Sequence, residues 1–281
     1  MLSHYHPVRR ICRVLGYARS RYYHQPRPRD EAPLKAVIER LAGAWPTDGD
    51  RRITALLHRE GLQVNHKHVA RLMRERGLQG HRPARRPRTT QSDHAYPRYP
   101  NLVQGLTIVR PDQVWVGDIT DVRLRQEVVY LAVLMDVYTR RIRGWHLSRH
   151  LDQTLTLTAL RRALAQRQPE IHHSDQGVQY AASADIQTLR DVGAQLSMAA
   201  VGEATENGYA ERLMRTITEE EVTLHDYEDF HDAYQHLARF LGAVYQHKRI
   251  HSALGYLTPA EVETQWMQQQ RRAVSVTLET P

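Results

Sequence analysis

Residues 113–124 read QVWVGDITDVRL, and residues 128–135 read VVYLAVLM. The first stretch alternates in part between apolar and polar side chains. The second is an unbroken apolar run, which is typical of a strand buried on both faces. Both stretches therefore predict strands of a sheet. Asp118 interrupts the first strand among apolar neighbours, where a buried charge is costly unless a partner or a metal ion compensates it.

The sequence downstream predicts further strands and helices of the same sheet. We expect strands at residues 142–147, 171–174 and 195–200, helices at 152–168 and 185–192, a long helix from about Asn207, and further helix at 228–248. Three strands, a helix, a strand, a helix, a strand and then helices describe an α/β sheet of the ribonuclease H-like kind.

Upstream, three apolar stripes at helical spacing predict three short helices within residues 30–80. The third helix begins after Asn65, a good N-cap, and ends at Gly77. Its cationic side chains are His66, Lys67, His68, Arg71, Arg74 and Arg76. Two short helices with such a face fit a helix-turn-helix that binds DNA, and a plain three-helix module with a solvated basic face is the alternative.

Composition divides the chain into five segments. They are a basic N-terminal helical segment at 1–29, a small all-α helix-turn-helix domain at 30–80, a basic Pro/Arg-rich linker at 81–108, an α/β core at 109–267 and a C-terminal tail at 268–281. The linker could follow a DNA backbone or act as a flexible tether.

Charge is distributed unevenly along the chain. Residues 1–100 hold 21 Lys and Arg against 8 Asp and Glu, while residues 101–281 hold 18 against 23. A concentrated positive field attracts polyanions, so the N-terminal half predicts a nucleic-acid contact surface. Arginine supplies 36 of the 39 positive charges, and a GC-rich genome is the alternative source of that bias.

Several classes of protein are excluded by composition. No apolar run reaches the roughly 18 residues that a membrane helix needs, and no apolar segment follows the basic N-terminus as in a secretory signal. We therefore expect a cytoplasmic, nucleoid-associated protein. Cys12 is the only cysteine, which rules out an intramolecular disulfide and zinc sites built from paired cysteines.

Three acids stand out by position. Asp118 lies within a predicted strand, Asp175 directly follows one, and Glu211 lies on the long predicted helix. Polar groups at strand ends are where ligands gather in open α/β sheets. On the helix, one apolar face is formed by Tyr209, Ala210, Leu213, Met214 and Ile217, with Glu211 at its edge. The side chain of an acid at this edge can point toward the sheet.

Five ordered motifs resemble a known family. They are WVGDIT at 115–120, YLAVLMD at 130–136, HSDQGVQY at 173–180, NGYAE at 207–211 and HKRIHSALGY at 247–256 with Pro259. They resemble the second-frame (orfB) transposases of bacterial insertion sequences, in the DDE and retroviral-integrase superfamily. The 35 residues between Asp175 and Glu211 match the family spacing. Upstream, RRI at 51–53 and CRVLG at 12–16 extend the resemblance over nearly the whole chain.

The resemblance implies a ribonuclease H-like integrase catalytic core in which Asp118, Asp175 and Glu211 are catalytic and hold two Mg²⁺ ions, with Mn²⁺ as a substitute. Carboxylate oxygens suit such hard cations, and in-line phosphodiester transfer uses two of them. By the resemblance Asp118 bridges the ions. Active-site neighbours would be His173, Asn207 and Arg215; Arg215 could instead pair with Glu219 along the helix.

The same resemblance implies DNA strand transfer: cleavage of insertion-element ends and their joining to target DNA. The expected DNA contacts are His66, Lys67, His68, Arg71, Arg74, Arg85, Arg86, Arg88, Lys248 and Arg249. Expected partners are a second copy of the chain on DNA and the upstream orfA product or its frameshift fusion. Departures from the family pattern occur at Asp48, Asp50, Asp121 and Glu206. A catalytically inactive or partial product that regulates transposition by binding DNA is the alternative.

Overall fold

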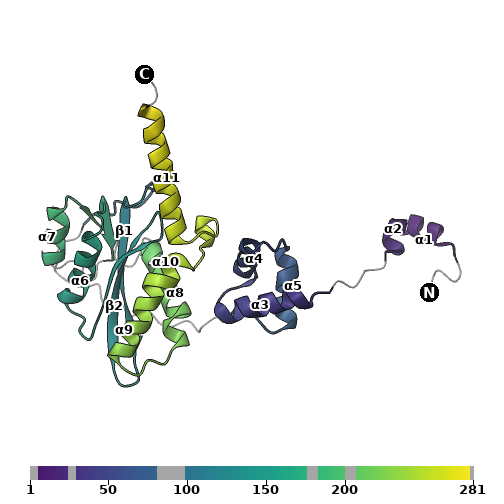
Figure 1. The fold of residues 1–281 in the computed structure, drawn as a ribbon, viewed down its shortest axis with the longest axis horizontal. Helices are drawn as coiled ribbons and strands as arrows, with labels where there is room; N and C mark the ends of the chain where they lie inside the picture. Colours follow the sequence, from purple (N-terminus) through teal and green to yellow (C-terminus); the bar gives the residue numbers. More distant parts are fainter. Residues whose placement is uncertain (1–5, 25–29, 81–98, 176–182, 200–206, 279–281) are drawn as a thin grey trace.

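The computed structural model describes residues 6–24, 30–80, 99–175, 183–199 and 207–278. Within them the N-terminal part is helical, with α1 at Val8–Val14, α2 at Arg19–Tyr22, α3 at Ala32–Ala44, α4 at Asp50–Arg59 and α5 at His66–Glu75 (Figure 1). The three helices predicted within residues 30–80 are thus confirmed. The predicted DNA contacts Arg85, Arg86 and Arg88 lie outside the described residues.

Helices α3, α4 and α5 enclose a small apolar core. Its buried members come from all three helices and are Ile38, Leu41, Ile53, Leu57, Val69, Leu72 and Met73. The predicted N-cap of α5 is confirmed, because Asn65 Oδ1 accepts a hydrogen bond from Lys67 N at 2.8 Å. This core fixes which side of α5 faces outward.

Five strands form one sheet in the order β3-β2-β1-β4-β5. They are β1 at Val114–Arg123, β2 at Val128–Asp136, β3 at Ile142–Ser148, β4 at Ile171–Ser174 and β5 at Gln195–Met198. The first three are antiparallel neighbours, and β4 and β5 run parallel to β1. This mixed sheet with helices on both faces has the ribonuclease H-like fold that the element order predicts.

Two helical layers cover the sheet (Figure 1). One face packs against α6 at Gln153–Leu164 and α7 at Ser183–Asp191, and the other packs against α8 at Gly208–Glu220 and α9 at Phe230–Arg239. Alternate residues of β2 enter the two layers: Leu131 and Val133 face α8, while Ala132 and Leu134 face α6. The prediction that this strand is buried on both faces is confirmed.

The C-terminal third contains elements that periodicity did not separate. A 3₁₀ turn at Val222–Leu224 follows α8, and α9 continues through the π-helical residues Phe240–Val244 into α10 at Tyr245–His247. After a 3₁₀ turn at Ser252–Leu254, the long helix α11 covers Pro259–Leu278 and crosses the boundary predicted at residue 268. Among the described helices, none combines the length and the apolar character needed to cross a bilayer.

One expectation about α8 is wrong. Ala210, Leu213, Met214 and Ile217 form its buried face, but Tyr209 is 40% exposed. The Arg140 guanidinium lies 4.3 Å from the centre of the Tyr209 ring, so a cation–π contact holds the ring outside the core.

Gly144 allows β3 and α6 to approach closely. A Cβ atom at this position would overlap the backbone oxygen of Ala159 and lie 2.8 Å from the Cβ of Ala163. We expect Gly144→Ala to lower the free energy of unfolding by about 1–3 kcal/mol, the usual cost of overpacking. Urea unfolding measures it. Gly43→Ala in α3 is the matched control, since nothing lies within 4 Å of its added Cβ. Equal stability of the two variants would contradict this account.

Asp185 is a buried acid between α6 and α7. It is 3% exposed, and Thr156 Oγ1 donates a hydrogen bond to its Oδ2 at 3.1 Å. Burial raises the pKa of Asp185 from 3.8 to about 7, against the smaller lowering effects of Thr156 and Arg161. Because the folded state holds the proton more tightly than the unfolded chain, the stability contributed by this proton is lost as pH rises from about 4 to about 7.

We expect Asp185→Asn to remove this loss, because the amide stays neutral and still accepts from Thr156. At pH 8 the variant should be more stable than the wild type by on the order of 1–3 kcal/mol, with a smaller difference at pH 5. Urea unfolding at both pH values tests it. Asp191→Asn, at the exposed end of the same helix, is the control. An unchanged pH dependence in Asp185→Asn would refute the assignment.

Candidate active site and DNA-contact surfaces

The parallel pairing of β1 with β4 sets the positions of two predicted catalytic acids. Val116 pairs with His173 and Gly117 with Ser174. Asp118 and Asp175 each come one residue after this last pair, so they lie at the same level. Neighbouring strands in a sheet are about 4.8 Å apart. Both acids are partly exposed. Asp118 Oδ1 also accepts a hydrogen bond from Ile119 N at 2.8 Å.

Helix α8 covers the face on which Asp118 lies. Val114 and Val116 belong to the apolar cluster that contains Ala210 and Leu213 of α8, whereas Trp115 packs on the other face. Side chains alternate along a strand, so Asp118 shares the face of Val114 and Val116. Glu211 follows Ala210 in the first turn of α8 and is partly exposed. The fold thus places Asp118 on β1, Asp175 directly after the neighbouring strand β4, and Glu211 on the helix that covers this face of the sheet.

Two of the predicted active-site neighbours are buried. His173 is 1% exposed, and its Nδ1 lies 2.8 Å from Ser197 Oγ on β5. Asn207 precedes α8, is 4% exposed, and its Oδ1 has no hydrogen-bond partner among the described residues. The neighbouring His172 faces the other layer, where burial and then His173 lower its pKa to about 4, so its imidazole is neutral at physiological pH.

Arg215 forms the helix ion pair that the sequence offered as one of two alternatives. Its Nε donates to Glu219 Oε1 at 2.9 Å, four residues along α8. The Arg215 side chain is still 57% exposed. Phosphate contact by Arg215 therefore requires competition with Glu219.

The cationic face of α5 is partly neutralised by acids of the same helical unit. His68 Nε2 lies 2.9 Å from Glu31 Oε1, and the guanidinium of Arg71 binds both Glu31 and Glu75. Arg71, followed by His68, lowers the pKa of Glu31 to about 2, so this acid stays charged. His66, Lys67 and Arg74 are exposed and form no ion pair within the described part of the chain.

The two predicted DNA contacts near the C-terminus differ in exposure. Lys248 is exposed, whereas Arg249 is 5% exposed. The Arg249 guanidinium donates two hydrogen bonds to Glu220, at 2.5 and 2.7 Å. Glu220 also accepts from Arg52 of α4 at 3.0 Å. Arg249 is therefore engaged at the contact between the helical unit and the core.

Asp48, one of the departures from the family pattern, belongs to the same contact. It is 3% exposed and lies 2.9 Å from Arg52 Nη1. Burial raises the pKa of Asp48 to about 6, with Arg52 acting in the opposite direction. Asp121 is exposed on β1.

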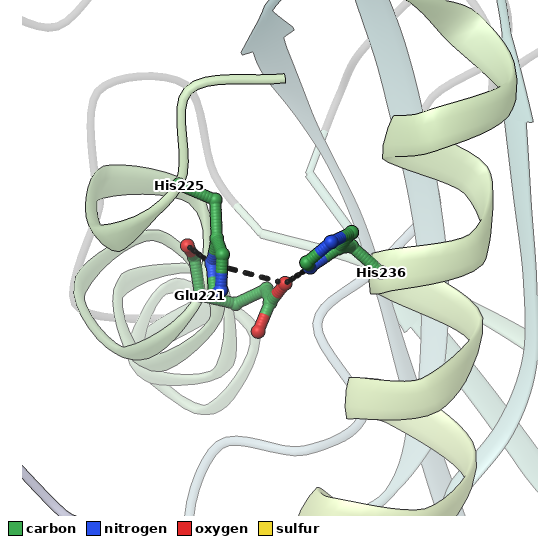
Figure 2. A group of neighbouring side chains, drawn as sticks. All are labelled: Glu221, His225 and His236. Carbon is green, nitrogen blue, oxygen red and sulfur yellow. Dashed lines mark hydrogen bonds and ion pairs between the residues drawn. The ribbon is translucent and has the colours of Figure 1, made fainter. Parts of the chain in front are cut away.

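Sequence reasoning missed two groups of polar side chains. One is a set of arginines from distant segments, which line a cavity of about 850 Å³ beside α8. The other is a cluster of Glu221, His225 and His236, in which the two imidazoles point toward the carboxylate (Figure 2). The i, i+4 spacing of Glu221 and His225 was the only local signal for the second group.

Family models match most of the chain. An integrase core domain model matches residues 109–204, a second integrase core domain model matches 192–259, and an HTH-like domain model matches 28–86. The transposase for insertion sequence element IS904 of Lactococcus lactis is 33% identical over 82% of this chain and 91% of its own length. The chain belongs to the family of insertion-sequence transposases with an integrase core domain. The resemblance inferred from the motifs is confirmed.

Other insertion-sequence proteins, and two retroviral structures of lower identity, are also similar to the chain. The insertion element IS600 uncharacterized 31 kDa protein of Shigella sonnei is 31% identical over 92% of this chain and 99% of its own, and the transposase for IS629 of Shigella sonnei is 32% identical over 90% of both. A simian T-cell lymphotropic virus intasome chain is 15% identical over 80% of this chain and 74% of its own, with a TM-score of 0.48. The HTLV-2 integrase catalytic core, solved with magnesium, is 13% identical over 54% of this chain and 97% of its own, with a TM-score of 0.41.

The exposed cations of α5 make a testable prediction for this transposase. If Lys67 and Arg74 contact phosphates, Lys67→Ala and Arg74→Ala should each weaken binding to duplex DNA from the flanks of the gene and reduce the salt slope of binding by about 1. Fluorescence anisotropy over a salt series measures both effects. Arg40→Ala on α3 removes the same charge, but this arginine pairs with Glu60. An equal effect of Arg40→Ala would show that only net charge matters.

Proposed function

We propose that this chain is a DNA transposase whose acids Asp118, Asp175 and Glu211 form the metal-dependent centre for cleavage and strand transfer. The observation that supports this most is the β1–β4 register, which aligns Asp118 with Asp175 below the helix that carries Glu211. Two aligned carboxylates at neighbouring strands repel each other, and such an arrangement is retained where a cation balances it.

The donor set suits a hard divalent cation. Three carboxylates offer oxygen ligands only, which is the preference of Mg²⁺, with Mn²⁺ as an alternative, and two ions are the expected complement. When bound, such ions supply activation of the attacking oxygen and stabilisation of the leaving oxygen in phosphodiester transfer. The chain itself holds the acids at fixed spacing, because β1 and β4 are buried strands and α8 is anchored by apolar packing on them.

The remaining parts of the chain fit the handling of DNA. Exposed cations on α5 would hold element ends, and Lys248 would contact the backbone near the core. Pairing two ends calls for at least two copies of the chain on DNA, and the upstream orfA product or its frameshift fusion is the proposed further partner. A cytoplasmic, nucleoid-associated location follows from this function.

Substitution of the acids tests the proposal. We expect Asp118→Asn, Asp175→Asn and Glu211→Gln each to reduce Mg²⁺-dependent nicking and joining of labelled end DNA by at least about a thousandfold, since each removes a charged ligand. DNA affinity should change little. Asp121→Asn, an exposed acid on the same strand as Asp118, is the matched control and should retain activity.

The alternative function, a regulator that binds element ends without cutting, predicts another outcome. Wild-type chain supplied with Mg²⁺ or Mn²⁺, with the orfA product added in a parallel reaction, would then bind the ends and never nick them. Cleavage that survives any of the three acid substitutions would instead refute the site assignment while leaving the family membership intact.

A further inference from the structure

A cavity of about 850 Å³ opens between the N-terminal helical unit and the core. Five arginines line it, and they come from four distant segments: Arg51 and Arg52 from α4, Arg140 from the turn between β2 and β3, Arg212 from α8, and Arg249 from the segment after α10. None of these segments is close to another in sequence. The fold therefore concentrates positive charge that the chain does not concentrate locally.

Carboxylates balance only part of this charge. Glu220 binds Arg52 and Arg249, and Asp48 lies beside Arg52. Arg51, Arg140 and Arg212 have no ion pair within the described ranges. His251 on the cavity wall responds to this positive charge. Burial lowers its pKa most, and Arg249, Arg140, Arg52 and Arg212 lower it further, to about 2. A wall with this surplus of cations attracts an anion.

Aromatic rings line the cavity together with the arginines. Tyr209 is 40% exposed on the wall, with Arg140 over its ring, and Tyr256 also lines the cavity. Arg140 adopts a left-handed backbone conformation, φ +63°, which is uncommon outside glycine and asparagine. Arginines interleaved with exposed rings are the usual wall of a site for single-stranded nucleic acid, where phosphates meet cations and bases stack on rings.

We propose that this cavity binds a single-stranded DNA segment of one or two nucleotides, with phosphate on Arg140 and Arg212 and a base on Tyr209. The volume equals a cube about 9.5 Å on a side. A duplex, whose major groove alone is about 12 Å wide, does not fit inside. Tyr209 and Arg212 lie on α8, the helix that also carries Glu211, while none of the three candidate acids is among the residues that line the cavity. This inference rests on the proposed function.

Anisotropy of a short fluorescein-labelled oligothymidylate on the full-length chain tests the site. We expect Arg212→Gln, Arg140→Asn and Tyr209→Ala each to weaken oligothymidylate binding about tenfold. Tyr209→Phe keeps the ring and should bind like the wild type. Asparagine at position 140 retains the left-handed backbone. Arg161→Gln, which removes an exposed arginine from α6 on the opposite face of the sheet, is the control and should bind normally.

Each outcome bears on the proposal. Equal losses in Arg161→Gln and Arg212→Gln, or no loss in either, would overturn it. Competition by inorganic phosphate as effective as that by thymidine monophosphate would overturn the base contact. If the acid variants abolish cleavage but the cavity variants bind oligothymidylate normally, the transposase function stands and the cavity site fails. If no cleavage occurs in any protein but the cavity variants lose binding, the cavity site stands alone.

A second cluster outside the candidate active site has the composition of a transition-metal site. Three side chains each offer a ligand atom: Glu221 at the end of α8, His225 after the 3₁₀ turn, and His236 on α9. These atoms all lie within 4.8 Å of one another. Glu221 Oε1 is 3.3 Å from His225 Nδ1 and 3.6 Å from His236 Nδ1 (Figure 2). Ligand atoms around a tetrahedral zinc ion with bonds of about 2.0–2.1 Å are about 3.3 Å apart.

The surroundings of this cluster favour metal ligation. Glu221 is 6% exposed, so its charge needs compensation, and Tyr227 Oη donates to it at 3.3 Å. His225 Nδ1 also lies 2.8 Å from the backbone oxygen of Glu221, so this atom can bind the ion when the ring proton is on Nε2. His236 Nε2 lies 3.7 Å from Asp232 Oδ1, which positions a carboxylate behind the second imidazole.

We infer that Glu221, His225 and His236 bind one Zn²⁺ ion, which would fix the end of α8 to α9 independently of any catalytic metal. Competition with a chromophoric chelator should show one tight zinc site in the wild type and its loss in His225→Gln/His236→Gln. His231→Gln, an exposed histidine of α9, is the control. Zinc should raise the Tm of the wild type and not that of the double variant, and Co²⁺ should give the absorption of a tetrahedral site.

Unchanged zinc stoichiometry in the double variant would overturn the inference. So would the absence of tetrahedral Co²⁺ absorption in the wild type, a measurement that does not depend on the folding of any variant. The cluster would then be a buried acid neutralised by imidazolium alone.

Discussion

The pairing of β1 with its two neighbours is the constraint on which the rest of the molecule depends. Strand β1 is antiparallel to β2 on one edge and parallel to β4 on the other. Because side chains alternate along it, its residues supply both apolar layers, with Val114 and Val116 toward α8 and Trp115 toward α6. A shift of one residue in this pairing would exchange the layers and move Asp118 to the wrong face. The cost of exposing those apolar side chains thus fixes the position of a carboxylate.

A buried ion pair has a comparable part in joining the helical unit to the core. Glu220 lies at the end of α8 and binds Arg249 from the core and Arg52 from α4. Its pKa is lowered mainly by these arginines, against the effect of burial, so it remains charged. Removing one partner of such a buried group is far more disruptive than the net stability of the group suggests. The same helix presents Glu211 near its start, so the DNA-contacting unit and the candidate active site share one support.

The fold was largely predictable because its signals are local. The apolar run at 128–135 and the helical stripes around Asn65 gave the right elements within a few residues. Tyr209 was misplaced because helical phase alone puts it beside Ala210, while the cation–π contact with Arg140 depends on a turn about seventy residues away. The helix α11 was missed because the polar stretch QQQRR at 268–272 interrupts its apolar periodicity. The cavity arginines could not be grouped, since only the tertiary fold brings them together.

Counts of charge along the sequence are therefore a poor guide to where this molecule presents charge. The excess of cations in residues 1–100 suggested α5 as the main surface for binding anions, yet Glu31 and Glu75 neutralise Arg71, and Glu31 also engages His68. The cavity wall, in contrast, combines Arg51 of the basic half with Arg140 and Arg212 of the acidic half, and these three have no ion pair within the described residues. Unpaired cations at a concave surface produce a stronger local potential than paired ones on a convex helix. What decides the contact surface is which arginines the fold leaves without a carboxylate.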